Sequence, residues 1–78
     1  MNEGQQRFYD FVMARVKEDK EEEIKAIMDE SFKRQQEGTF TKEYMAETAP
    51  KMIMLLRPEC VEEFKKAAEH MSSQLKNN

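Results

Sequence analysis

The chain contains one histidine, His70, and one cysteine, Cys60, which are residue types suited to nucleophilic or metal chemistry. They lie ten residues apart in a segment that we predict to be one helix. Nearly three helical turns therefore separate the two side chains, which is too far for a hydrogen bond between them. A metal site at His70 would need a second ligand one turn away, but positions 66, 67 and 74 hold lysine, alanine and glutamine. We therefore expect His70 to be a solvated helix residue and Cys60 to be a partly buried structural thiol, with a redox role for Cys60 as an alternative. We predict no catalytic site and no metal site.

Calcium binding is a second chemistry to test, because Gly38 lies between two predicted helices, as the central glycine of an EF-hand loop does. This alignment places Lys33 at the first loop position and Tyr44 at the last, where calcium requires carboxylates. Gln35, at the third position, adds no charge. The segment is better explained as a capped turn in which Gly38 ends one helix and Thr41 begins the next. We expect no bound calcium and no other cofactor.

Charged residues supply two further candidates. The stretch 18–23 is acidic, but it falls at a predicted helix start, where negative charge suits the helix dipole, and we interpret it as a solvated face. An anion pocket would form if the fold brought together the four arginines, which are Arg7, Arg15, Arg34 and Arg57. Their convergence is the basis of an alternative function as a small-ligand or anion-binding module, or as an enzyme whose site is built from separate helices.

The overall composition excludes several classes of protein. A length of 78 residues predicts one domain, 1–78, with frayed ends at about 1–4 and 76–78. The 13 basic residues are unclustered and are outnumbered by 16 acidic ones, so we do not expect binding to nucleic acid. The longest apolar run, 52–56, is far shorter than the ~20 residues of a membrane-spanning helix, and we expect no membrane association. A single cysteine and charges that interrupt the N-terminal apolar residues predict a cytoplasmic protein without a signal peptide.

The elements that must position these residues are helical. Residues that favour helices (Glu, Lys, Met, Gln and Ala) are frequent, and no stretch alternates long enough to form a strand. We predict an all-α fold, a small bundle of four to five amphipathic helices at about 5–16, 20–37, 42–48, 50–56 and 58–75. The last of these has the most regular apolar face, with spacings of three and four residues, formed by Val61, Phe64, Ala68, Met71 and Leu75.

Local signals predict where the helices begin and end. Asp19 is the expected N-cap of the second helix, with Glu22 completing a capping box. Phe40 and Met45 are placed to form a hydrophobic staple around the start of the third helix. Pro50 lacks an N–H and clashes with the carbonyl four residues back, so we expect a kink or a break there.

The segment Met52–Leu56 departs from the amphipathic pattern. Met52 shares a face with the apolar residues before it, whereas Met54 lies nearly opposite and Leu55 lies on the flank. A helix that is apolar all round is either central in its own core or covered by another molecule, and both explanations stay open here. Methionine suits permissive contact surfaces. The candidate partner interface is therefore Met52, Met54 and Leu55, with Tyr9 and Met13 of the first helix as a second patch.

The sequence predicts binding rather than catalysis. We expect a small cytoplasmic helical-bundle protein, not an enzyme, that acts by protein–protein interaction or self-association, with a homodimer as one form. Its partner would be another protein or a second copy. The arginine-based alternative given above would require at least two of those side chains to meet in one cleft.

Overall fold

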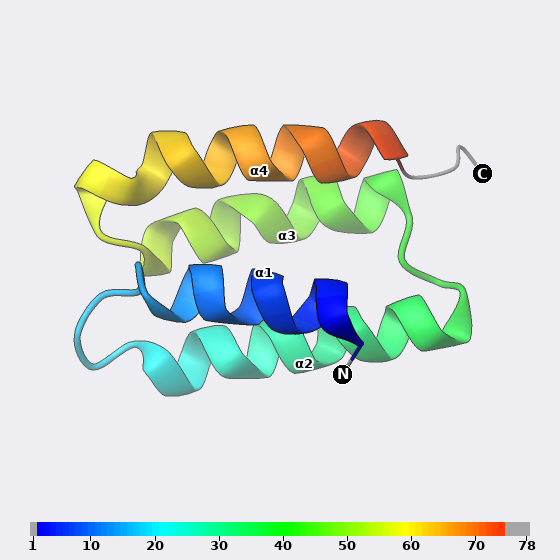
Figure 1. Cartoon of the computed structure of the whole chain (residues 1–78), viewed down its shortest axis with the longest axis horizontal. Coiled ribbons are helices and arrows are strands. Elements are labelled where there is room, and N and C mark those ends of the chain that lie inside the picture. Colours follow the sequence, from blue (N-terminus) through cyan, green and yellow to red (C-terminus); the bar gives the residue numbers. More distant parts are fainter. Residues whose placement is uncertain (1, 75–78) are drawn as a thin grey trace.

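The helices run antiparallel to their neighbours in the chain, as Figure 1 shows. The computed structural model describes the backbone of residues 2–74 and the side chains of residues 2–70. This part of the chain forms four α-helices, α1 (Glu3–Met13), α2 (Glu21–Glu37), α3 (Lys42–Leu55) and α4 (Val61–Gln74), and a short 3₁₀ helix, η1 (Pro58–Cys60). The prediction of a small all-α bundle is confirmed. Of the ends expected to be frayed, residues 1 and 76–78 lie outside the described residues.

One apolar core joins the four helices. Phe64 of α4 is only 2% exposed, and its ring lies 6.3 Å from the ring of Phe8 in α1, which links the first helix to the last. The other apolar members of the core are Val12, Val16, Ile24, Met28, Phe32, Met52 and Leu56. The predicted faces of the helices therefore pack against one another in the described part of the chain. Met71 and Leu75, predicted on the same face as Phe64, lie outside the described side chains.

The first helix is shifted towards the N-terminus relative to the predicted span 5–16. The side chain of Asn2 accepts a hydrogen bond from the Gln5 amide at 2.8 Å, and the Gln5 side chain accepts one from the Asn2 amide at 3.2 Å. This capping box starts α1 two residues earlier than predicted. At the other end, Val16 leaves the helix to form an isolated antiparallel β-bridge with Leu56.

The β-bridge ties the end of α1 to the end of α3. The Lys17 amide donates to the Leu55 carbonyl at 2.8 Å, and the Arg57 amide donates to the Arg15 carbonyl at 3.0 Å. The ammonium group of Lys17 also donates to the Met54 carbonyl at 3.0 Å. Carbonyls at the end of a helix have no partner within the helix, so these bonds satisfy groups that would otherwise need water.

The prediction that Asp19 caps the second helix is wrong. Lys20 occupies the N-cap position and makes no side-chain capping bond. Asp19 instead has a positive φ of 74°, in the left-handed region that aspartate tolerates better than most residues. The chain has to reverse within a few residues after the β-bridge, and this turn takes Asp19 away from a capping geometry. Negative charge at the start of α2 comes from Glu21, Glu22 and Glu23.

The two caps predicted for the connection between α2 and α3 are confirmed. Gly38 closes α2 in the left-handed conformation, with φ 76°, and the Thr39 amide donates to the Arg34 carbonyl at 2.8 Å. The Thr41 hydroxyl caps α3 by accepting from the Tyr44 amide at 3.1 Å. These two caps fix where one helix ends and the next begins.

Pro50 does not divide the third helix, so the structure excludes the break into helices at 42–48 and 50–56, which was one of the two alternatives at Pro50. α3 is continuous through Pro50. Pro50 and Ala46, whose carbonyl loses its helical donor, are both exposed. The free carbonyl therefore lies on the solvent side of the helix, where water can bond to it. The predicted helix 58–75 does begin at Pro58, but its first turn is the 3₁₀ helix η1.

The buried position of Phe64 leads to a stability prediction. Phe64→Ala should lower the free energy of unfolding by about 3–5 kcal/mol, because it leaves a cavity at the junction of α1 and α4. Thermal or urea unfolding followed by circular dichroism measures the change. Lys66→Ala, at an exposed position of the same helix, is the matched control and should stay within about 0.5 kcal/mol of the wild type. Equal stability of the two variants would contradict the described packing.

The two glycines offer a second, paired prediction. Nothing lies within 4 Å of a Cβ added to Gly38, so Gly38→Ala should cost about 1–2 kcal/mol through its positive φ alone. Gly4 lies in α1, where a Cβ would meet only an ordinary contact at 3.6 Å. Gly4→Ala should therefore be neutral or stabilise by up to about 1 kcal/mol. Unfolding experiments on both variants should show a loss of stability for Gly38→Ala alone, and a loss of stability in both would refute the assigned backbone conformations.

Candidate functional site

The chemically reactive residues lie in separate places. Cys60 is buried at the start of the last helix, and a guanidinium nitrogen of Arg57 donates towards its sulfur at 3.8 Å. His70 is exposed and lines an open cleft of about 390 Å³ together with Asn2, Gln5 and other residues. Among residues 2–74, no group of three or more His, Cys, Asp or Glu side chains is placed to hold a metal ion.

Two of the four arginines meet at the β-bridge, but the anion-site alternative requires their side chains to meet in one cleft. Arg15 and Arg57 are joined there through their backbones. Their terminal guanidinium nitrogens already have partners, although the buried Nε of Arg15 has none within residues 2–70. Arg15 lies 3.3 Å from Glu63 and donates to the Phe11 carbonyl at 2.9 Å. Arg57 donates to the Ala14 carbonyl at 2.7 Å and lies 3.9 Å from Glu59. These arginines therefore stabilise the end of the bundle, and neither lines any cleft described here.

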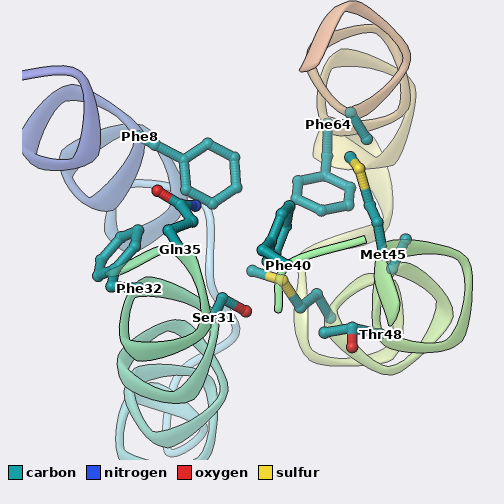
Figure 2. A pocket seen from close by; sticks show the side chains of 11 residues that line it. Phe8, Ser31, Phe32, Gln35, Phe40, Met45, Thr48 and Phe64 are labelled. Carbon is teal, nitrogen blue, oxygen red and sulfur yellow. The ribbon is translucent and has the colours of Figure 1, made fainter. Parts of the chain in front are cut away.

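A small apolar cavity lies between the α1–α2 pair and the α3–α4 pair (Figure 2). The rings of Phe8, Phe40 and Phe64 and the side chain of Met45 face it. Its volume of about 30 Å³ is far below the ~150 Å³ of an apolar cavity that takes up benzene. The Ser31 hydroxyl beside it already donates to the Ile27 carbonyl at 3.0 Å. The cavity is thus a small packing gap in the core and has no room for a ligand.

The structure separates the five residues predicted as a partner interface. Met52 is 4% exposed and belongs to the core, so it is not available to a partner. Leu55 and Met13 are half-buried and pack against the core. Tyr9 also packs against the core and lines a groove between α1 and α2. Met54 alone is largely exposed, at 74%, among the large apolar side chains of residues 2–70.

Met54 belongs to an exposed face of α3 that the sequence reading overlooked. Ala46, Pro50 and Met54 are spaced four residues apart and are all exposed, so they lie on one side of the helix. Half-buried Ile53 borders them. We call these four residues, with the exposed charged residues among them, the outer face of α3. The four-residue spacing was visible in the sequence, but the predicted break at Pro50 obscured it.

Charge is distributed unevenly along the outer face of α3. The first half carries Glu43 and Glu47, which are both exposed. The second half carries exposed Lys51, and the ammonium group of Lys17 lies at the Met54 carbonyl. Within residues 2–70, neither glutamate and neither lysine forms an ion pair. The face is therefore acidic before Pro50 and basic after it, and the charged residues run beside the apolar ones.

Comparison with protein families, with curated proteins and with solved structures finds no match for this chain. The membrane question has a separate answer: no helix within residues 2–74 combines the length and the apolar content needed to cross a bilayer.

The different burial of Met52 and Met54 predicts opposite effects of the same substitution. Met52→Glu places a carboxylate in the core and should unfold the protein, at a cost of about 3 kcal/mol or more. Met54→Glu changes an exposed position and should leave the free energy of unfolding within about 0.5 kcal/mol of the wild type. Circular dichroism during urea unfolding compares the two. Unfolding of the Met54 variant would show that this side chain is a core residue.

Proposed function

We propose that this protein is a small binding module that acts through protein–protein contact, with the outer face of α3 as the contact surface. The observation that carries the proposal is the 74% exposure of Met54 in line with Ala46 and Pro50. Single exposed apolar residues are common on protein surfaces and need no explanation. Here the apolar residues follow one another along a helix and are flanked by charges that form no ion pair within residues 2–70, as in an interface with an apolar centre and a polar rim.

The other surfaces support this choice by comparison. Tyr9 and Met13, the second predicted patch, pack against the core of the bundle and offer less accessible area. The central cavity is too small for a ligand, and Arg15 and Arg57 are occupied by their own carboxylate and carbonyl partners. Binding rather than catalysis is therefore the function that we assign. We propose the cytoplasm as its location, because the single cysteine, Cys60, allows no disulfide within the chain.

Site-specific photo-crosslinking tests this function. Benzoylphenylalanine placed at Met54 in the full chain should form a discrete covalent adduct with a protein on irradiation of cells that make this protein. The same group at Lys66, an exposed position of α4, is the matched control. We expect a strong adduct from position 54 and a weak or absent one from position 66, since only the former lies on the proposed surface.

The result would contradict the proposed function if position 54 gave no adduct, or if both positions gave the same set of weak adducts. The mass of the adduct identifies the partner class. A mass of twice 9.3 kDa indicates a second copy of the chain, and any other mass indicates a different protein.

A further inference from the structure

We propose that the outer face of α3 binds the same face of a second copy, so that two α3 helices pack antiparallel about a twofold axis near residues 49–50. This inference rests on the proposed function and identifies its partner. It follows from the order of charges along α3, where Glu43 and Glu47 precede Pro50 and Lys51 follows it. A symmetric dimer requires a surface that is complementary to itself.

The antiparallel arrangement satisfies this requirement on both sides of the axis. Residues equally far from the axis lie opposite each other when two identical helices run in opposite directions. Glu47 then lies opposite Lys51 of the partner subunit, and by symmetry the same contact forms a second time. The acidic half of each face lies over the basic half of the other, whereas a parallel arrangement would place like charges together.

The apolar centre fits the same register. With the axis near residues 49–50, Met54 lies over Ala46 of the partner subunit, and the two Pro50 residues lie near each other. Alanine and proline are small enough to leave space for a flexible methionine side chain. Each Met54, 74% exposed in the single chain, would thus become covered.

A second copy fits this face better than a partner of uniform charge. An acidic peptide would meet Lys51 and Lys17 favourably but would meet Glu43 and Glu47 with repulsion, and a basic peptide would do the reverse. Only a partner with the opposite order of charges matches the whole length. One helix from each subunit forms a contact at the small end of the range for specific interfaces, so we expect a dissociation constant on the order of 0.1 mM.

Charge reversal at the two facing positions tests this register. Sedimentation equilibrium of the purified full chain at low salt, from about 10 µM to 1 mM, should show a reversible dimer of the wild type. Glu47→Lys and Lys51→Glu should each weaken dimerisation by about 10-fold or more, because each places like charges opposite each other twice. An equimolar mixture of the two variants should regain dimerisation, since the mixed dimer has opposite charges at both contacts.

The equimolar mixture is the decisive measurement, because mixing the two variants changes the contacts between the chains and nothing within either chain. Both sites are exposed, and thermal melting of each variant checks that it stays folded. Met54→Glu tests the same surface independently, through its apolar residues, and should also abolish the dimer. A wild type that stays monomeric at about 1 mM, or a mixture no more dimeric than its components, would overturn the proposal. In that case, a crosslink from position 54 to a protein of another mass would still support the proposed function as a binding module. The absence of any crosslink would contradict both the dimer and the proposed function.

Discussion

α3 packs along its length against two neighbours and meets the end of α1 only at the β-bridge, and this arrangement governs which side of α3 the protein can bury. α3 packs against α2 on one side and α4 on the other, which covers Thr48 and Met52 but leaves the opposite side in solvent. Apolar residues on that side have no other element of residues 2–74 to cover them. The proposed partner surface is therefore a consequence of the fold, because the same helix that completes the core carries Met54 outwards.

The β-bridge between residues 15–17 and 55–57 fixes which side of α3 faces outwards. Its backbone hydrogen bonds hold the end of α3 against the end of α1, so Leu56 points into the core and Met54, two residues earlier, does not. Lys17 links the two features, because its amide belongs to the bridge and its ammonium group marks the basic end of the outer face. The fold and the proposed contact surface therefore share one structural restraint.

The sequence predicted those features whose causes are local. The left-handed closure at Gly38 and the cap at Thr41 depend on a few neighbouring atoms, and both were predicted correctly. Asp19 was assigned wrongly because the β-bridge, a contact between distant residues, decides the path of the chain there. The outcome at Pro50, a kink or a break, stayed open because the cost of a proline inside a helix depends on whether the freed carbonyl reaches water. Likewise, Met52 and Met54 have the same residue type, and only the packing of the bundle distinguishes a core residue from a surface residue.

Dilution of the isotope-labelled protein, followed by the NMR spectrum of its backbone amides, tests the central claim most directly. If the outer face of α3 binds a second copy, the amide signals of Ala46, Lys51, Ile53 and Met54 should shift progressively between about 1 mM and 20 µM, while those around Tyr9 stay fixed. A spectrum that does not change with concentration would contradict the account, as would shifts confined to the groove between α1 and α2.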